Sequence, residues 1–394
     1  MNNLENLLTK KSDGGMEYEP EIFDLTKTED QVSVDSLFSA GKIHRVVDDY
    51  QEQVKEYFQI SNPSGVYAPD FEEKFKNHLD SLVKEKPLWQ QGRWVYYPWL
   101  SSLVHLLEDE AFQVVRTGRN RNLINVEEQK KFYNCTIGVA GLSVGNSVTL
   151  AITLQGGARH IKIADHDVLA LSNLNRIRAG VEFLALPKVI MTARQIYSLN
   201  PYAKVEIFQA GLTPENIGKF FDGLDLVIDE IDNLATKYLI REEAKKRCLA
   251  VVMAADNGDN GVVDVERYDL DPQPEFFHGR LGEVSYDFLK SLDKFGIGKY
   301  ITKHVGPENV TERMQQSLLE MGKTVVSWPQ LGGAALLNGS AVAYCVRKIL
   351  TGQPLESNRA LVSLDEKLTP DYNSAEQVAR RQTVADSFRK IFGL

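Results

Sequence analysis

Apolar and polar residues follow two rhythms along the central part of the chain, one typical of strands and one typical of helices. Short apolar runs such as CTIGVAG (135–141) and LAVVMAAD (249–256) are typical of buried strands. Residues 187–199 and 234–248 instead space their apolar residues at three and four, as amphipathic helices do. Because such segments alternate from residue 135 onward, the pattern predicts an α/β fold with a Rossmann-like, doubly wound, mainly parallel sheet covered by helices.

The same pattern predicts three parts: an N-terminal arm and helical extension (1–111), a nucleotide-binding domain (112–270) and a C-terminal α+β extension (271–394). Residues 1 to about 30 are polar and acidic and are expected to form a loose arm. The individual elements expected are strands at 135–141, 160–167, 204–210, 224–232 and 249–256, and helices at 48–58, 71–82, 100–115, 146–155, 187–199, 214–222, 234–248 and 331–351.

Composition narrows the class of protein. With 394 residues, 43% hydrophobic residues and a net charge of −9, the chain is typical of a globular protein and has no basic excess for a nucleic acid. No apolar run approaches the roughly 20 residues that a membrane span needs, and the N-terminus lacks a signal-peptide core, so we expect a cytoplasmic protein. The three cysteines lie far apart, which argues against disulfides and structural zinc and predicts small buried side chains.

The stretch GLSVG (141–145) has two interpretations. It fits G-x-S-x-G, in which Ser143 would be the nucleophile of a hydrolase, and it also fits a glycine-rich turn that binds phosphate through Gly141, Ser143 and Gly145. A nucleophile elbow usually follows several strands, whereas this loop ends the first strand of the series. Asp165 stands 20 residues after Gly145, where a nucleotide site has an acid for the ribose hydroxyls. The nucleotide interpretation is therefore favoured.

The next segments distinguish ATP from NAD. Asn173, Arg176 and Lys188 follow the ribose acid, and two cations there suit the charge that develops when the α-phosphate of ATP is attacked. The stretch LDLVIDEIDN (224–233) ends a strand with carboxylates, of which Asp232 is placed to hold Mg²⁺. The structural alternative for Asp232 is the N-cap of the helix that follows.

These residues together resemble the adenylation domain of the ThiF/MoeB/HesA family, the bacterial relatives of ubiquitin-activating E1 enzymes. The resemblance covers about residues 112–270, with a weaker echo near 329–354. Its most specific pieces are Asp165, SNLNR (172–176), Asn200-Pro201 and DEIDN (229–233).

The resemblance implies an activity and a site. A carboxylate, from a ubiquitin-like carrier protein, a peptide or a small molecule, would attack the α-phosphate of ATP to give an acyl adenylate and pyrophosphate. The ATP contacts would come from the loop, Asp165, Asn173, Arg176 and Lys188, and the magnesium ligand would be Asp232. Arg119, in RTGRN, matches an arginine that enters a neighbouring subunit's site, which implies a homodimer with composite ATP sites; its structural alternative is a solvated basic turn.

The sequence also departs from the family. The loop has fewer glycines, zinc-binding cysteine pairs are missing, and residues 255–330 hold no cysteine for a thioester. Lys237 and Arg241 stand where the family more often has Arg and Asn. Two other functions stay open: an NAD-binding oxidoreductase, and an ATP-binding scaffold without catalysis.

Overall fold

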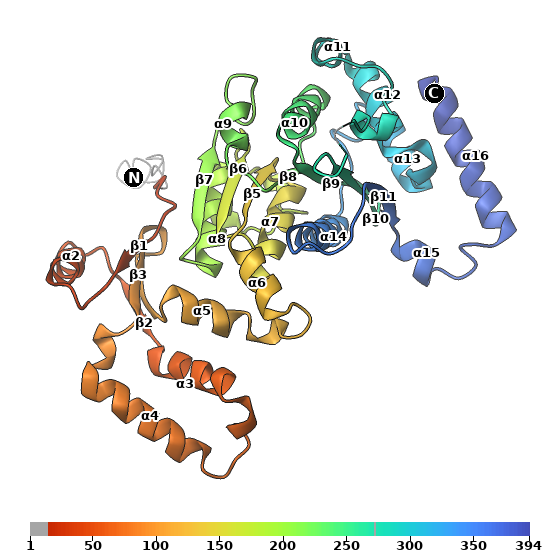
Figure 1. Cartoon of the computed structure of the whole chain (residues 1–394). Helices are drawn as coiled ribbons and strands as arrows, with labels where there is room; N and C mark the ends of the chain where they lie inside the picture. The colour runs from red at the N-terminus through yellow and green to blue at the C-terminus, as the bar shows by residue number, and fades with distance from the viewer. Residues whose placement is uncertain (1–14, 272) are drawn as a thin grey trace, which may run out of the picture. The chain divides into compact units, whose positions relative to one another are not determined.

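A computed structural model describes residues 15–271 and 273–394 of the chain (Figure 1). Its described residues group into two compact units. The first consists of 15–127 and Ala193–Tyr202, and the second of Glu128–Thr192 and Ala203–Leu394. The sequence placed the corresponding boundary at 111/112.

The first unit carries, within its described residues, a four-stranded sheet in the order β1-β3-β4-β2. Pairing is antiparallel between β1 and β3 and between β3 and β4, and parallel between β2 and β4. Its elements are β1 (Glu21–Phe23), β2 (Arg45–Asp48), β3 (Arg93–Tyr97), β4 (Ser102–Leu106), α2 (Thr28–Ser39), α3 (Tyr50–Ser61), α4 (Phe71–Glu85) and α5 (Asp109–Arg116), with short 3-10 turns η1 (Pro63–Gly65), η2 (Leu88–Gln90), η3 (Pro98–Leu100) and η4 (Gly118–Asn120).

Two sequence predictions for this unit are wrong in part. Of the expected loose arm, residues 1–14 lie outside the described residues and the remainder contains β1. The expected helix over 100–115 begins with strand β4 and becomes helical only at Asp109. The local pattern allowed either structure, because short apolar runs do not separate strand from helix. Three aromatic residues of this unit, Trp94, Tyr96 and Tyr97, are buried. The N-terminal extension therefore holds a sheet as well as helices.

The second unit contains, as far as it is described, a seven-stranded sheet in the order β11-β10-β9-β8-β5-β6-β7. Strands β9, β8, β5, β6 and β7 run parallel, while β10 and β11 are antiparallel additions at one edge. The mainly parallel, doubly wound sheet is confirmed. Its strands are β5 (Thr136–Ala140), β6 (His160–Ala164), β7 (Lys204–Phe208), β8 (Leu226–Asp229), β9 (Ala250–Asn257), β10 (Asn260–Arg267) and β11 (Asn358–Val362).

Helices cover this sheet and form most of the C-terminal extension. The two that pack most intimately are α7 (Val144–Leu154) and α14 (Gly332–Leu350): a Cβ on Gly339 would lie 2.7 Å from the Cβ of Ser147. The missing side chain of Gly339 therefore permits the close approach of the two helices. The remaining helices are α6 (Val126–Tyr133), α8 (Lys188–Leu199), α9 (Ile217–Phe221), α10 (Leu234–Arg247), α11 (Tyr286–Lys290), α12 (Lys294–Val305), α13 (Glu312–Leu319), α15 (Leu364–Leu368) and α16 (Ala375–Phe392), with 3-10 turns η5 (Leu171–Asn173), η6 (Val181–Phe183), η7 (Phe276–Gly279) and η8 (Pro307–Asn309).

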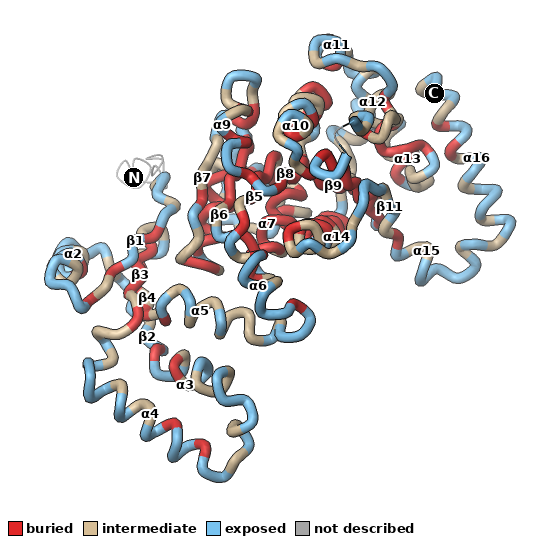
Figure 2. The backbone as a smooth tube through the Cα atoms, in the orientation of Figure 1, coloured by how far each residue is buried: buried red, intermediate tan, exposed pale blue. Residues whose placement is uncertain are grey.

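Burial is concentrated in the parallel strands and the helix faces against them (Figure 2). The strand order reverses at β5, with β6 on one side and β8 on the other. In doubly wound sheets this switch point is where the carboxyl ends of the strands leave room for a ligand. None of the helices in the described residues combines the length and hydropathy needed to cross a bilayer.

Candidate functional site

The glycine loop follows β5 at the switch point. Gly141 has a φ of +87°, and its N–H donates to the carbonyl of Ala164 over 2.8 Å. A Cβ at this position would lie 2.3 Å from the carbonyl oxygen of Glu230, so the turn requires glycine. Helix α7 then begins at Val144 with no side-chain cap from Ser143, which leaves its first N–H groups without that partner. Such a terminus is suited to phosphate.

The Ser143 side chain argues against the hydrolase interpretation. Its hydroxyl accepts a hydrogen bond from Nε of Arg176 over 2.9 Å. A serine nucleophile needs a base that can take its proton, and a guanidinium stays protonated in proteins. Ser143 is placed instead to hold Arg176 beside the glycine loop.

Asp165 joins the end of β6 to the same loop. Its Oδ2 accepts from the N–H of Leu142 over 2.7 Å, and its Oδ1 accepts from the N–H of Asp167 over 2.8 Å. The carboxylate is buried, yet each oxygen keeps a second lone pair that could accept from a ribose hydroxyl. The position predicted for the ribose acid is therefore next to the glycine loop.

Lys188, the first residue of α8, is buried beside this acid. Its ammonium donates to Oδ2 of Asp167 over 2.7 Å and lies 3.9 Å from Oδ2 of Asp165. Burial raises the pKa of Asp167, but the bond from Lys188 more than offsets this and the pKa is lowered overall. Asp165, His166 and Asp167 bring possible metal-ligand atoms within 4.8 Å of one another, yet Lys188 already pairs with Asp167, and we assign no metal to the group.

The SNLNR segment contributes Arg176 and shapes the turn that carries it. Oδ1 of Asn173 accepts from the N–H of Ala170 over 3.0 Å, which closes the 3-10 turn η5. Arg176 Nη1 donates to Oδ1 of Asn175 over 2.9 Å. Burial lowers the pKa of Arg176, and the nearby acids Asp232 and Asp256 oppose this shift. Asn173 thus has a structural partner, and its predicted phosphate contact stays a prediction.

Asp232 lies just beyond β8, and its structural alternative is wrong. The N-cap of α10 is Asn233, whose Oδ1 accepts from the N–H of Thr236 over 3.0 Å. Burial raises the pKa of Asp232, while the charges of Lys237, Lys188 and Arg176 lower it. Asp165 raises it further. The structure therefore brings Asp165, Arg176, Lys188 and Asp232 into one electrostatic neighbourhood.

Two further carboxylates share this neighbourhood and were not assigned a role from the sequence. Burial raises the pKa of Glu230 well above its usual range, and its Oε1 accepts from the N–H of Ala254 over 2.9 Å. Burial also raises the pKa of Asp256, which accepts hydrogen bonds from the amides of Asn338 and Gln330. Asp256 ends a predicted strand, so its position on the sheet edge was visible in the sequence, but its partners lie on and before α14.

Asp229, in the same DEIDN motif, belongs to a separate buried network. Its Oδ2 accepts from Lys237 Nζ over 3.1 Å and is also paired with Arg241 Nη1. Arg241 Nη2 lies 2.8 Å from Oε1 of Glu266, and the Oε2 of the same carboxylate accepts from the hydroxyl of Tyr268. The two residues at which the chain departs from the family, Lys237 and Arg241, thus bind the same carboxylate. Asp229 is a structural residue.

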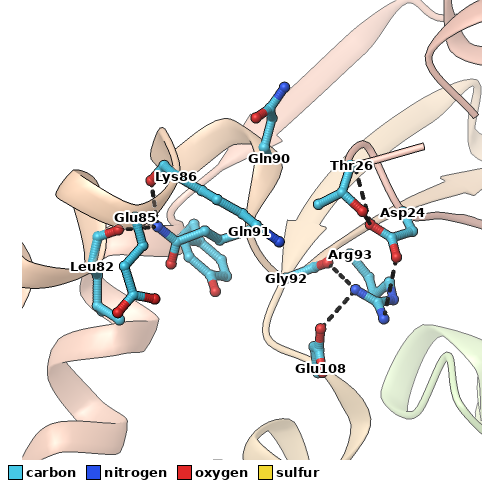
Figure 3. A pocket seen from close by; sticks show the side chains of 11 residues that line it. Asp24, Thr26, Leu82, Glu85, Lys86, Gln90, Gln91, Gly92, Arg93 and Glu108 are labelled. Atoms are coloured by element: carbon cyan, nitrogen blue, oxygen red, sulfur yellow. Dashed lines mark hydrogen bonds and ion pairs between the residues drawn. The ribbon is translucent and has the colours of Figure 1, made fainter. Parts of the chain in front are cut away.

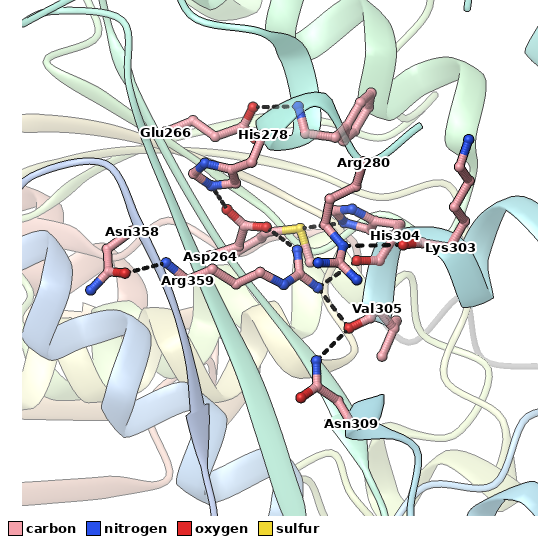
Figure 4. Close-up of polar contacts among 12 residues, drawn as sticks. Asp264, Glu266, His278, Arg280, Lys303, His304, Val305, Asn309, Asn358 and Arg359 are labelled. Atoms are coloured by element: carbon pink, nitrogen blue, oxygen red, sulfur yellow. Dashed lines mark hydrogen bonds and ion pairs between the residues drawn. The ribbon is translucent and has the colours of Figure 1, made fainter. Parts of the chain in front are cut away.

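The C-terminal extension is tied to β10 by a second network (Figure 4). Asp264 Oδ1 contacts Nε2 of His278 and its Oδ2 contacts Nη1 of Arg359, each at 2.5 Å. Arg359 Nη2 also donates to the carbonyls of His304 and Val305. The histidines that the sequence left without a function therefore help attach 276–305 and β11 to the sheet.

The remaining predicted residues fall outside these clusters. Arg119 lies in the first unit, exposed on turn η4, and its role in a partner's site stays a prediction. Cys135 and Cys345 are buried as expected, and burial raises the pKa of their thiols to about 12 and about 11. Cys248 is exposed at the end of α10 with a φ of +55°, so the prediction of a buried side chain is wrong there.

The chain is similar in sequence to a known protein family and to several known proteins. Residues 117–275 match the model of the ThiF family. The chain is 37% identical over 310 residues to "Uncharacterized protein MT1398" of Mycobacterium tuberculosis (strain CDC 1551 / Oshkosh), which covers 78% of this chain and 43% of that protein. It is 32% identical over 122 residues to "Probable adenylyltransferase/sulfurtransferase MoeZ" of the same strain, covering 31% of each chain.

A solved structure of E. coli MccB with ATP has 15% identity and a TM-score of 0.44, covering 61% of this chain and 64% of that one. The chain spans less than half the length of the first two curated relatives. The glycine loop, the two strand-end acids and the basic SNLNR segment all lie inside the matched residues. The part of the chain that is similar to the ThiF family, residues 117–275, is therefore the part that carries the candidate site.

Proposed function

We propose that this domain catalyses the ATP-dependent adenylation of a carboxylate. The observation that carries the proposal is the convergence of Arg176, Lys188 and Asp232 beside a helix N-terminus that no side chain caps. Two cations and a set of free N–H groups suit a triphosphate, whereas the diphosphate of NAD needs fewer positive charges.

In the proposed reaction a carboxylate oxygen attacks the α-phosphorus of ATP. The bond between the α-phosphorus and the bridging oxygen breaks, and the electron pair leaves with pyrophosphate. Arg176 and Lys188 would neutralise the charge that develops on the phosphates, and the N–H groups at the start of α7 would bind one of them. Asp165 would accept a hydrogen bond from a ribose hydroxyl. The work of the site is positioning and charge neutralisation rather than covalent catalysis.

Asp232 would hold a Mg²⁺ ion, which when bound supplies positive charge to the phosphates. The residues fit this assignment. Asp232 is released from helix capping by Asn233, and burial has already made its negative charge costly, so a cation would be favoured there. Lys188 would have to be shared between Asp167 and the nucleotide, because the two compete for its ammonium.

The substrate and the assembly follow from the family resemblance. We propose a carrier-protein or peptide C-terminus, or a small-molecule acid, as the substrate, and a cytoplasmic homodimer in which Arg119 enters the partner's site. A thioester step is not proposed, because the pKa of the Cys135 and Cys345 thiols is raised and Cys248 sits at the end of α10.

The first test is calorimetric titration of the chain with ATP and Mg²⁺, and separately with NAD⁺. Replacing Asp232 by Ala should weaken Mg²⁺-dependent ATP binding by at least about tenfold. Asp287→Ala removes an exposed acid from the first turn of α11 and serves as the matched control, with unchanged binding expected. An unchanged affinity in Asp232→Ala, at an unchanged melting temperature, would refute the magnesium assignment.

The same titrations separate the two competing functions. NAD⁺ binding without ATP binding would identify an oxidoreductase. Tight ATP binding without any carboxylate-dependent exchange of pyrophosphate into ATP would identify a scaffold. Mixed dimers of Arg119→Ala and Asp232→Ala should regain one working site, and a failure to do so would refute the action of Arg119 on its partner.

A further inference from the structure

The first unit holds a polar pocket of about 290 Å³ that the adenylation site does not explain (Figure 3). Its walls come from the start of α3, the end of α4, the turn after it and the beginning of β3 and α5. The polar and charged side chains that line it include Tyr50, Glu85, Lys86, Gln90, Arg93 and Glu108. All of them belong to one unit, so the pocket is defined within that unit.

Tyr50, which lines the pocket, is the first of three stacked rings. Tyr50 stacks on His105 with ring centroids 4.1 Å apart, and His105 stacks on Trp94 at 4.3 Å, with interplanar angles of 10° and 8°. His105 is held in place from both sides, because Nδ1 contacts Asp48 over 2.9 Å and Nε2 contacts the carbonyl of Gln91 over 2.7 Å. The orientation of the Tyr50 ring is therefore fixed before any ligand arrives.

Gly92 lets the backbone approach this ring. It has a φ of +61°, and a Cβ there would lie 2.5 Å from Cε2 of Tyr50 and 2.3 Å from the carbonyl oxygen of Leu106. The Tyr50 side chain is consequently enclosed, and the residue is only 7% exposed. Within the described part of the chain its hydroxyl has no hydrogen-bond partner, although it lines the pocket. Because this hydroxyl lines the pocket, it can donate a hydrogen bond to an acceptor on a ligand.

Some of the charged side chains around the pocket form ion pairs with one another, and others do not. Arg93 Nη1 donates to Oε1 of Glu108 over 2.7 Å and to the carbonyl of Gly92 over 2.6 Å, and Nη2 lies 3.7 Å from Asp24. By contrast, neither the Lys86 ammonium nor the Glu85 carboxylate pairs with another described residue. These two exposed side chains, one cationic and one anionic, line the same pocket as the Tyr50 hydroxyl.

We propose that this pocket binds a free α-amino acid in its zwitterionic form. Lys86 and the Tyr50 hydroxyl would receive the carboxylate, and Glu85 would receive the ammonium group. The formal charges of the lining side chains are three negative (Asp24, Glu85, Glu108) and two positive (Lys86, Arg93), which disfavours a simple anion and favours a ligand with an amine. Burial raises the pKa of Tyr50 to about 12, so its hydroxyl stays protonated and can donate. The volume suits a ligand of this size.

The test measures binding to the full chain by each of the twenty L-α-amino acids, first as a shift of melting temperature and then by calorimetry. At least one should bind at millimolar concentration or tighter. Acetate and propionate, which lack the amine, and methylamine and ethylamine, which lack the carboxylate, should bind about tenfold more weakly or not at all.

Two pairs of variants test the assigned contacts. Lys86→Gln and Tyr50→Phe should each weaken amino-acid binding by about tenfold, because each removes one donor while Phe keeps the ring stack. Lys84→Gln removes an exposed lysine of the same helix α4, and Tyr57→Phe removes an exposed hydroxyl of helix α3; both should bind like the wild type.

The outcomes are decisive in either direction. No binding by any amino acid, equal binding of propionate or ethylamine, or equal losses in Lys84→Gln and Lys86→Gln would overturn the proposal. The melting temperature of each variant identifies one that has failed to fold, and Gln90→Ala then provides a second test, since this half-buried residue lines the pocket. Binding is measured without ATP, so the result is independent of the adenylation function.

Discussion

Two acids three positions apart, Asp229 and Asp232, belong to charged groups that are built in opposite ways. Asp229 is fully buried and contacts both Lys237 and Arg241, which lower its pKa although burial alone would raise it. Asp232 shares its surroundings with several cations, yet burial raises its pKa and no described cation is recorded in contact with it. The carboxylate of Asp229 is thus in contact with two cations, whereas the carboxylate of Asp232 is near cations without contacting any of the described ones.

The difference separates a structural role from a functional one. A buried ion pair offsets its desolvation only when its partners are in contact and hydrogen-bonded, and the Asp229 network meets that condition. An acid whose charge is left costly in the free protein is stabilised once a ligand supplies the missing positive charge. Perturbed groups of this kind gather at functional sites. The comparison therefore predicts opposite effects on stability for neighbouring substitutions.

The largest effect is expected for Asp229→Asn. The change leaves Lys237 and Arg241 buried without their carboxylate, so the free energy of unfolding should fall by about 3–5 kcal/mol. Urea denaturation of the wild type and the variant measures it. Glu242→Gln, on the exposed side of the same helix, is the control and should change stability little. A loss below about 1 kcal/mol would mean that the network is not closed.

Gly141→Ala tests the turn after β5, which packs against the backbone of Glu230 between Asp229 and Asp232. A Cβ would clash with the carbonyl of Glu230 and the φ of +87° disfavours alanine, so stability should fall by about 2–3 kcal/mol. ATP binding should weaken as well, because the loop must move.

Gly333→Ala is the matched control for this substitution. No atom lies within 4 Å of a Cβ at Gly333, in the first turn of α14, and alanine there should stabilise the helix by up to about 1 kcal/mol. If both variants lose stability equally, the turn at Gly141 does not require its glycine.

Like Asp229, Asp264 is a buried acid in contact with cationic partners, and acid titration can measure its contribution to stability. Burial raises the pKa of Asp264, but His278 and Arg359 more than offset this and lower it to about 2. A depressed folded pKa gives stability that is present above the unfolded value near 4 and is lost as the pH falls toward 2. The wild type should lose about 2 kcal/mol more than Asp264→Asn between pH 5 and pH 2.5.

The stabilisation contributed by His278 changes with pH in the opposite direction, since it is lost as the pH rises. The pKa of His278 is raised by its bond to Asp264, so its contribution is complete below the unfolded value near 6.5 and is lost as the pH rises through the folded pKa. Unfolding free energies at several pH values should therefore show the pair most stabilising between about pH 4 and pH 6.5. Parallel pH profiles for wild type and Asp264→Asn would contradict the assignment.

The smallest effect, and the one with the opposite sign, is expected for Asp232→Asn. The folded state raises the pKa of this acid, so its charge destabilises the fold at pH 7 and the amide should be neutral or stabilising by up to about 1 kcal/mol. Thermal unfolding in the absence of nucleotide measures it, and Asp287→Asn is the exposed control. A clear loss of stability would place Asp232 with the structural acids.

Much of the second unit could be predicted because its strands and helices have clear hydrophobic patterns in the local sequence. Strands β5, β8 and β9 are short, nearly uninterrupted apolar runs, and α10 carries its periodicity over many residues. The first unit was harder. Strand β4 has an apolar spacing that also fits a helix, and β1 is three residues long and depends on pairing with β3.

The candidate site was predictable in part for the same reason. Asp165 and Asp232 stand at strand ends, where the sequence places them without knowledge of packing. Asp256 ends β9 in the same way, but its importance comes from Asn338 and Gln330, more than seventy positions away. His278 and Arg359 acquire a role only because β10 brings Asp264 between them. Contacts across such distances leave no local pattern.

The sequence by itself determined the alternation of strands and helices, the glycine turn after β5 and the set of polar residues at the strand ends, because these depend on periodicity and residue type over a few positions. The tertiary structure decided which of those residues are structural. Asp229, Glu230 and Asp232 are almost equivalent in the sequence. Only the packing of α10 and β10 gives Asp229 two cations, leaves Glu230 buried with a backbone N–H, and leaves Asp232 with its charge unsatisfied. The physical reason is that the free energy of a charge depends on the atoms that surround it, and those come from distant parts of the chain.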